Sequence, residues 1–529
     1  MIFRVANPSR GGAVLDFKKI LKRVFVWALE VQARPCDLFV LVVYAAIIGF
    51  GIWNHEPWSD EAIPWVIVRE NNFGGLLNFI FHNWDLHPIL SYLLLFPLVK
   101  LGLPYAAQAV LNGLLSVGAA FLFITKAPFA RIFRYLFLFS FYMLYEYSVI
   151  ARPYMLAILL VFILATFYEK RDKRPYWYAI LVMLLLHTDY MVFGLGAGLT
   201  VAFAVEHLGK KQRGMGFWIP LGIMVFNVLW VFWMGRSLPA GHHEYGQRIS
   251  FNVQNIAQTI TNAFSPFAGQ VVYAKVISPL ALWGGVVVFA LVFTSVRKNI
   301  ASLLILTISL GYLFIVFAFL HVGDYRHHGF ILLTCVFVFW IGASQEFRGS
   351  GKSSKAHSRV RPLALTLIAL FLALGVQNVY FVYLQEYFLP FSGAKEMAES
   401  IRGLQKGRDI FRQGYVIVAK HKRSSALMPY LPGIKFWNPC VGDYASYYIN
   451  NRAIGACDDA PIADILNQTQ VHFHGFDKVL LLLEQPLPIE EDSFYRYQKV
   501  YASGEKAFGY RQESFYLYRL QRKVPREVH

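Results

Sequence analysis

The sequence predicts a polytopic α-helical membrane protein with about eleven transmembrane helices and a C-terminal α/β domain outside the membrane. Apolar residues make up 56% of the 529-residue chain and charged residues only 16%, whereas soluble domains average about 25% charged residues. The apolar residues fall into runs of roughly 16 to 22, the length of a membrane-spanning helix. Helices must form these spans because lipid offers no hydrogen-bond partner to open backbone groups.

Basic residues gather at the ends of the apolar runs, so the formal charge of +18 indicates membrane topology and lipid contact and not a nucleic-acid partner. The segment 1–37 is rich in lysine and arginine and is predicted to be cytoplasmic, with residues 16–34 forming a basic amphipathic helix on the inner leaflet. Further basic loops are predicted on the same side at residues 126–134, 169–174, 210–213, 297–299 and 348–361.

With these loops inside, the remaining apolar runs are predicted to span the membrane. The apolar stretch 88–104 is excluded, because counting it would invert every later loop and because Pro97 and Lys100 interrupt it. We expect it to be an interfacial or re-entrant helix. The eleven predicted spans lie near residues 38–53, 106–125, 133–150, 154–168, 176–193, 194–208, 217–234, 272–294, 301–320, 330–346 and 362–384.

This threading divides the chain into three parts. Residues 38–384 form the membrane module, whose first external loop is 54–105, and residues 385–529 form an extracytoplasmic domain. With roughly 145 residues, that domain is long enough for a core of its own. We expect a multi-pass protein of a bacterial inner membrane, with the N-terminus inside.

The C-terminal domain has the pattern of a soluble α/β fold. Residues 415–419 and 478–484 are predicted to be buried strands, and residues 392–406 have helical spacing. Cys440 and Cys457 both lie in this domain and could form a disulfide if it faces an oxidising compartment. Their spacing alone does not decide whether the geometry allows the bond.

The same threading collects the unusual polar residues on the predicted outer face. Ionisable groups at membrane depth are costly, so they face a cavity or pair with one another. Because these residues come from five separate loops, we interpret them as a candidate site. They are Asp60, Glu61, Asp85, His87, Arg152, His187, Asp189, His242, His243, Glu244, Asp324, Arg326 and His327.

These residue types suit a phosphate-bearing, hydroxyl-rich substrate at the bilayer surface. Arginine and histidine can hold a lipid phosphate, and arginine matches the phosphate oxygens bidentately. A carboxylate can take the proton of an attacking hydroxyl. A cluster of carboxylates and histidines can also hold a divalent ion, so a metal ion is an open alternative.

Structural interpretations of the same residues stay open beside the functional one. Asp60 and Glu61 could be the N-cap and first-turn acid of a helix, which the helix dipole favours. Arg152 could snorkel to lipid headgroups, and His187 and Asp189 could satisfy each other between helices. Loop or headgroup polarity is the corresponding alternative for His87, His242, His243, Glu244, Arg326 and His327.

Two stretches resemble motifs of a known family. The Asp60-Glu61 pair after the first span, followed by "HPILSYLLLFPLVKLG" at 87–102, resembles the first loop of GT-C glycosyltransferases. The resemblance is closest to the branch that holds the protein O-mannosyltransferases and the bacterial aminoarabinose transferases of lipid A. "YSVIARPYMLAILLV" at 147–161 resembles the arginine-containing motif that opens the fourth span in that branch. The resemblance covers roughly residues 38–346.

The resemblance implies a membrane enzyme that moves a sugar from a polyprenyl phosphate to an acceptor on the external face, with inversion. Asp60 would be the general base or the acid that positions the acceptor, and Glu61 its supporting group. By the same resemblance Arg152 and Arg326 would bind the donor phosphate. His87 and His327 are candidates for the same contact because of their residue type and their place on the predicted outer face. The sugar and the acceptor, whether protein, lipid or glycan, are not implied.

The chain departs from the family pattern at two positions. Tyr154 stands where members often carry an aspartate, which puts a metal site in doubt, and Ile89 replaces the second proline after His87. A transporter or flippase of a lipid-linked or anionic solute is the main rival function, although transporters usually show internal repeats and none is visible here. The third hypothesis is a non-catalytic assembly protein or lipid-binding protein with the same fold.

Overall fold

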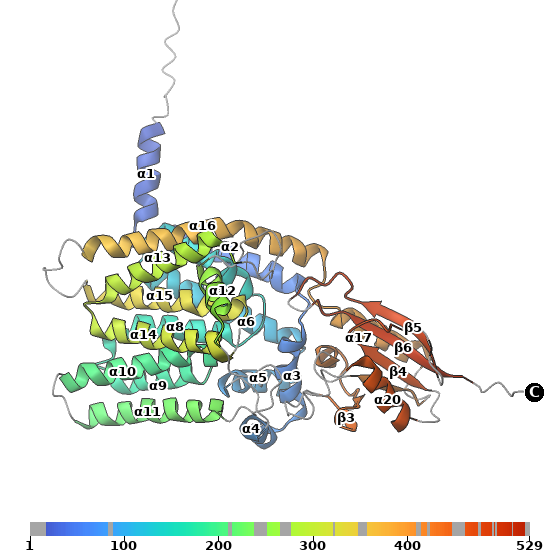
Figure 1. The fold of residues 1–529 in the computed structure, drawn as a ribbon. Coiled ribbons are helices and arrows are strands. Elements are labelled where there is room, and N and C mark those ends of the chain that lie inside the picture. Colours follow the sequence, from blue (N-terminus) through green and yellow to red (C-terminus); the bar gives the residue numbers. More distant parts are fainter. Residues whose placement is uncertain are drawn as a thin grey trace, which may run out of the picture.

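In the computed structural model, the N-terminal three quarters of the chain form a helical bundle, and a sheet domain lies at one end of it (Figure 1). The structure describes residues 17–82, 88–209, 214–236, 251–264, 277–320, 323–346, 357–408, 414–419, 424–446, 461–473, 478–488, 491, 495–509 and 512–523.

The helical elements up to the sheet domain are, in chain order, α1 (Phe17–Leu29), α2 (Pro35–Asn54), α3 (Ser59–Glu70), α4 (Phe73–His82), α5 (Leu90–Lys100), α6 (Ala106–Lys126), α7 (Arg131–Leu138), η1 (Tyr142–Glu146), α8 (Tyr154–Phe167), η2 (Tyr168–Lys170), α9 (Pro175–Leu186), η3 (Tyr190–Val192), α10 (Phe193–Gly209), α11 (Met215–Arg236), α12 (Val253–Phe264), α13 (Pro279–Val296), α14 (Ile300–Ile315), η4 (Val316–Leu320), α15 (Tyr325–Glu346) and α16 (His357–Phe388).

Eight helices in the described part of the chain are long and apolar enough to cross a membrane. The prediction of a polytopic helical membrane protein is therefore confirmed. The eight segments are Pro35–Asn54, Ala106–Lys126, Tyr190–Leu208, Met215–Gly235, Pro279–Val296, Ile300–Leu320, Tyr325–Ala343 and Val360–Phe388.

The other three predicted spans differ from a full transmembrane helix. The spans 154–168 and 176–193 correspond to α8 and α9, which have 14 and 12 residues. At about 1.5 Å per residue such helices are shorter than the roughly 30 Å hydrocarbon core. The prediction of one helix over 133–150 is wrong, because α7 ends at Leu138 and a single π-turn, η1, follows it.

The irregular segment 139–153 lies inside the bundle and finds its hydrogen-bond partners there. The side-chain amide of Asn112 donates to three carbonyls of this segment at 2.9 to 3.3 Å, and the Tyr44 hydroxyl donates to the carbonyl of Met143 at 2.6 Å. Non-helical backbone at membrane depth is tolerated only where protein groups satisfy it. These contacts hold the end of the segment, where Arg152 lies, in one place.

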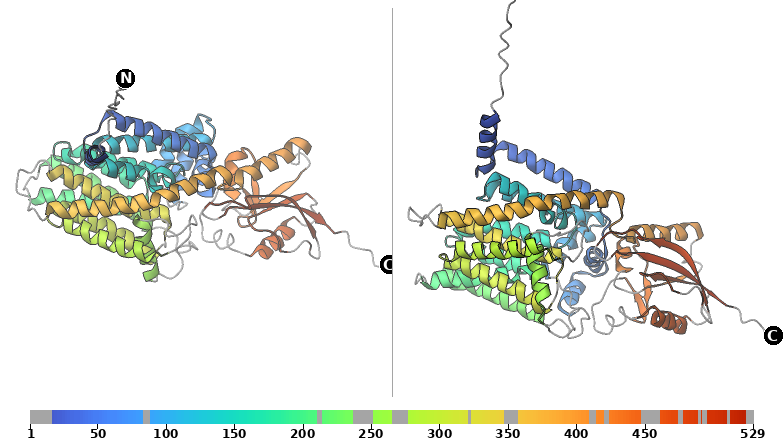
Figure 2. Two further views of the ribbon diagram at one scale, coloured as in Figure 1. Left: turned by 90° about the horizontal axis from the view of Figure 1, so that it is seen from above. Right: turned by 45° about the horizontal axis from the view of Figure 1, so that its top comes forward.

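The two ends of the bundle differ. Helices α10 and α15 end, and helices α11 and α16 begin, at the end opposite the sheet domain (Figure 1), the end where basic loops are predicted. Helix α1, predicted over 16–34, is found at Phe17–Leu29 and stands across the direction of the bundle helices (Figure 2). Its Val24, Phe25 and Val26 are exposed, as an interfacial helix requires.

The C-terminal part is a six-stranded mixed sheet with strand order β3-β2-β1-β4-β6-β5. Strand β1 runs parallel to both β2 and β4, and the other pairs are antiparallel. Helix α17 and η5 cover one face and α20 covers the other. The elements are α17 (Ala394–Arg408), β1 (Val416–Ala419), η5 (Ser425–Tyr430), β2 (Phe436–Asn438), β3 (Asp443–Ala445), α20 (Ile462–His472), β4 (Val479–Leu483), β5 (Tyr495–Ser503) and β6 (Phe515–Arg522).

The strands expected at 415–419 and 478–484 are β1 and β4, and the expected helix is α17. The domain joins the bundle through α3, whose Val66 packs into the core formed by α17, η5 and the sheet. Cys440 is disulfide-bonded, whereas Cys36 and Cys335 are free. Cys457 lies outside the described residues.

Candidate active site

Asp60, in the first turn of α3, lies between two arginine side chains. Its Oδ2 atom is 3.5 Å from Nη1 of Arg152 and 3.3 Å from Nη2 of Arg326, and Arg152 also donates to the Asp60 carbonyl at 2.7 Å. The Asp60 side chain is 26% exposed, whereas the two guanidinium side chains are 8% and 9% exposed. The carboxylate is therefore more accessible than either guanidinium, and the three side chains come from α3, α15 and the residues just before α8.

The contacts of Arg326 extend the group. Asp324 lies 3.4 Å from its guanidinium, and the guanidinium lies over the Trp58 ring, 5.1 Å from the ring centre. His327 accepts the Asp324 backbone N–H at Nδ1, and its Nε2 is 3.1 Å from the Tyr154 hydroxyl. Asp324, Arg326 and His327, all predicted site residues, thus lie beside Asp60.

Glu61 is fully buried beneath this group, and protein donors occupy both of its oxygens. Oε1 accepts the backbone N–H of Ala151 at 2.6 Å. Oε2 contacts Nε2 of His55 at 2.9 Å and the backbone N–H of Trp58 at 3.3 Å. The Glu61 side chain is 1% exposed. In this position it holds the backbone N–H groups of Ala151 and Trp58 and the imidazole of His55.

His55 joins Glu61 to a second buried carboxylate. Its Nδ1 lies 2.7 Å from Oε1 of Glu386, at the end of α16, and Oε1 also accepts the Tyr145 hydroxyl at 2.5 Å. Burial lowers the pKa of His55, but the carboxylates of Glu386 and Glu61 outweigh it and raise the pKa to about 10. A protonated imidazole therefore bridges the two acids and ties α16 to α3.

Gln108, on α6, completes the support of Arg152. Its Nε2 donates to the carbonyls of Glu61 and Ala151 at 2.9 and 3.1 Å. The backbone N–H of Ala151 thus donates to the Glu61 side chain, and its carbonyl accepts from the Gln108 side chain. Sequence reasoning missed Gln108 and His55; the available signal was that Gln108 and Asn112 place two amides on one face of an apolar helix.

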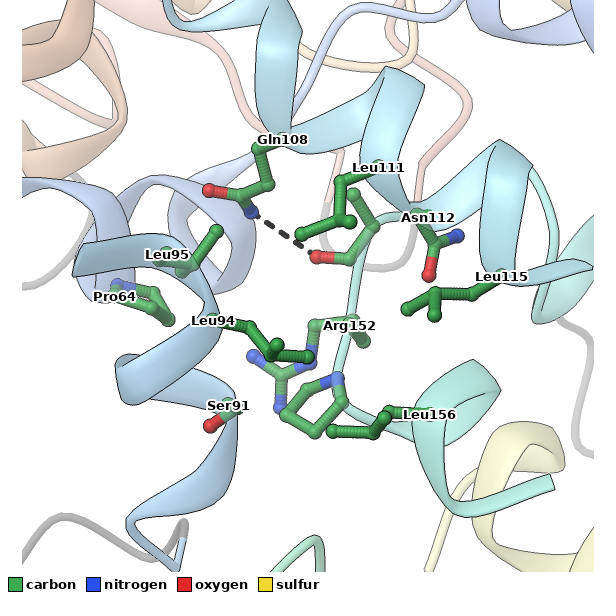
Figure 3. A pocket seen from close by; sticks show the side chains of 12 residues that line it. Pro64, Ser91, Leu94, Leu95, Gln108, Leu111, Asn112, Leu115, Arg152 and Leu156 are labelled. Atoms are coloured by element: carbon green, nitrogen blue, oxygen red, sulfur yellow. Dashed lines mark hydrogen bonds between the residues drawn. The ribbon is translucent and has the colours of Figure 1, made fainter. Parts of the chain in front are cut away.

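A mostly apolar cavity opens beside Arg152, with about 460 Å³ of empty space that includes the open solvent at its mouth. Figure 3 shows the Arg152 side chain among the lining residues and Gln108 at the cavity edge. Helix α5, the stretch excluded as a span, forms one wall; it has only 11 residues. The lining residues are Pro64, Ser91, Leu94, Leu95, Gln108, Leu111, Asn112, Leu115, Ala151, Arg152, Pro153 and Leu156.

Other predicted site residues lie in different surroundings. His187 contacts the Asn227 side chain at 2.9 Å, and Asp189 accepts the backbone N–H of Met191 at the start of η3. The rest lie outside the described residues: Asp85, His87, His242, His243 and Glu244.

The described residues contain no group of three or more His, Cys, Asp or Glu side chains placed to hold a metal ion. Because the histidine-rich segment 242–244 and the pair Asp85 and His87 lie outside the described part, a metal ion stays an open prediction.

Comparison with protein-family models and with curated proteins gave no match. Among solved structures, the chain is similar to ArnT from Cupriavidus metallidurans, whose structure holds undecaprenyl phosphate. The likeness covers 84% of this chain and 93% of that one, with 12% identity and a TM-score of 0.46. A likeness at this level assigns no substrate to the chain.

Proposed function

We propose that this protein is a membrane glycosyltransferase that moves a sugar from a polyprenyl phosphate to an acceptor on the extracytoplasmic face of its membrane. One observation carries the proposal: the Arg152 side chain both lines the apolar cavity and pairs with the accessible Asp60 carboxylate. The apolar cavity would thus bind the polyprenyl chain, Arg152 the phosphate and Asp60 the reacting hydroxyl, and the three lie side by side.

The donor's phosphate would bind at the two arginines. Their contacts with Asp60, at 3.3 and 3.5 Å, are longer than the roughly 2.7–2.9 Å of a strong charge-assisted hydrogen bond. Each guanidinium has five N–H donors, so a phosphate can take over donors that Asp60 holds loosely. The first isoprene units would lie along α5 and α6 in the cavity, with the rest of the chain in the bilayer.

The chemistry needs one base and one good leaving group. Asp60 takes the proton of the acceptor hydroxyl while the oxygen of that hydroxyl forms a bond to the anomeric carbon of the sugar. The bond between that carbon and the phosphate oxygen breaks, and its electron pair stays on the phosphate, which Arg152 and Arg326 stabilise. The products are a polyprenyl phosphate and a glycosylated acceptor in which the configuration of the anomeric carbon is inverted. The phosphate leaves without a general acid to protonate it.

Binding of undecaprenyl phosphate to the purified full-length chain tests the donor site. We expect Arg152→Gln and Arg326→Gln each to weaken binding about tenfold or more, because each removes charged hydrogen bonds to phosphate. Native mass spectrometry in detergent can measure the affinity, with undecaprenol as the ligand that lacks the phosphate.

Arg496→Gln is the matched control, because Arg496 is exposed on β5 and pairs with Glu491. It should bind as the wild type does. Equal affinity for undecaprenyl phosphate and undecaprenol, or normal binding in the double variant of Arg152 and Arg326, would rule out this donor site. Transfer of labelled sugar from a panel of undecaprenyl-phosphate sugars to membrane fractions then separates a transferase from a transporter, which would make no new glycosidic bond.

A further inference from the structure

The connection between β5 and β6 reaches out of the sheet domain and touches the start of α3. Glu513, in this connection, is 2% exposed. Its Oε1 atom accepts the Ser59 hydroxyl at 2.5 Å and the Ser59 backbone N–H at 3.2 Å. Its Oε2 atom accepts the Ser392 hydroxyl at 2.8 Å. A carboxylate of the C-terminal domain thus caps the helix whose second residue is Asp60.

Close backbone contacts fix the position of the chain around Glu513. The Gly393 N–H donates to the Glu513 carbonyl at 2.9 Å. Gly504 has a φ of +71°, and a Cβ atom there would lie 2.3 Å from that carbonyl oxygen. The β5 to β6 connection is therefore pressed against the segment that follows α16, which limits how far Glu513 can move relative to α3.

The contact between Glu513 and Ser59 stabilises the first turn of α3, the turn that carries Asp60. The first backbone N–H groups of a helix have no partner within the helix and carry its positive dipole end, which a carboxylate stabilises. Ser59 is the first residue of α3, and the contacts of the Asp60 carboxylate with the two arginines are long, at 3.5 and 3.3 Å. We propose, building on the glycosyltransferase function above, that Glu513 is a positioning residue that makes the C-terminal domain part of the active site by fixing the start of α3 and hence Asp60.

Titration of Glu513 offers a readout of this contact. Burial raises its pKa to about 7, with the Ser59 and Ser392 hydrogen bonds opposing the rise and Asp60 adding to it. The Tyr105 hydroxyl, just before α6, also interacts electrostatically with Glu513. As the pH rises through 7, Glu513 becomes charged and holds Ser59 more firmly, so the transfer rate should rise over the same range.

The test compares Glu513→Gln with Glu505→Gln in the purified full-length chain. Glu505 lies in the same connection but is exposed, so it is a matched control for the same chemical change. We expect Glu513→Gln to lower kcat about tenfold, since neutral hydrogen bonds are roughly half as strong as charged ones. The rise in rate near pH 7 should vanish, and affinity for undecaprenyl phosphate should stay within about twofold of wild type.

Amide hydrogen exchange at the start of α3 provides a measurement that does not depend on activity. Exchange there should be faster in Glu513→Gln than in wild type or Glu505→Gln. Unchanged hydrogen exchange or an unchanged pH profile in Glu513→Gln would overturn the inference. An equal loss of kcat and of lipid affinity would also overturn it, because such a loss indicates general disruption of the fold. A wild-type chain that transfers no sugar would instead overturn the proposed function, and the inference with it.

Discussion

Asp60→Asn is expected to reduce sugar transfer by roughly 10²- to 10⁴-fold, the range that a positioned general base contributes. Asparagine has nearly the same shape but cannot take the acceptor's proton. Affinity for undecaprenyl phosphate should be kept or increased, because the variant removes the carboxylate that competes for Arg152 and Arg326. Initial transfer rates and lipid affinity, measured on the same preparation, check both parts.

Glu70→Gln is the control for this variant, because Glu70 ends the same helix and pairs with Arg69 at the far end from Asp60. It should transfer sugar at a rate close to wild type. If Asp60→Asn kept its activity, the assignment of Asp60 as base would be wrong. Loss of lipid binding together with loss of folded protein would instead show that Asp60 serves only to pair the two arginines.

Replacing His55 with Gln should destabilise the folded chain by about 3–5 kcal/mol, the usual cost of removing one partner from a buried ionic group. The imidazole bridges Glu61 and Glu386, and without its charge two carboxylates would lie buried close together. The yield of folded protein and the melting temperature in detergent measure the effect.

His207→Gln provides the comparison for His55→Gln. His207 is also buried, but the carboxylate of Asp172, with which it pairs, is 42% exposed and 3.5 Å away. Water can therefore stabilise that carboxylate when the imidazole is lost, and we expect a loss of no more than about 1 kcal/mol. Equal losses in the two variants would contradict the bridging role of His55.

The stability of the chain should also fall at alkaline pH. The folded-state pKa of His55 is raised to about 10 from an ordinary value of 6.5. Its contribution is therefore complete below pH 6.5 and is lost as the pH rises through 10. Melting temperatures between pH 7 and pH 10 should decline more steeply in wild type than in His55→Gln. Parallel curves would show that other groups cause the decline.

Local patterns in the sequence determined most of the architecture. Runs of apolar residues predicted the spanning helices, because a helix in lipid must satisfy its own backbone whatever surrounds it. The strands β1 and β4 and the helix α17 were predicted in the same way. The span expected over 133–150 failed because Asn112 and Tyr44, from other helices, supply partners that let the chain leave the helix.

The sequence also predicted Asp60, Arg152 and Arg326 as candidate site residues, since charges at the ends of apolar runs need a reason to be there. Only the tertiary structure decided how they meet. The carboxylate of Asp60 lies between two guanidiniums, and Glu513 caps the Asp60 helix from 454 positions along the chain. Such contacts depend on distances between segments far apart in the sequence, which no local pattern records.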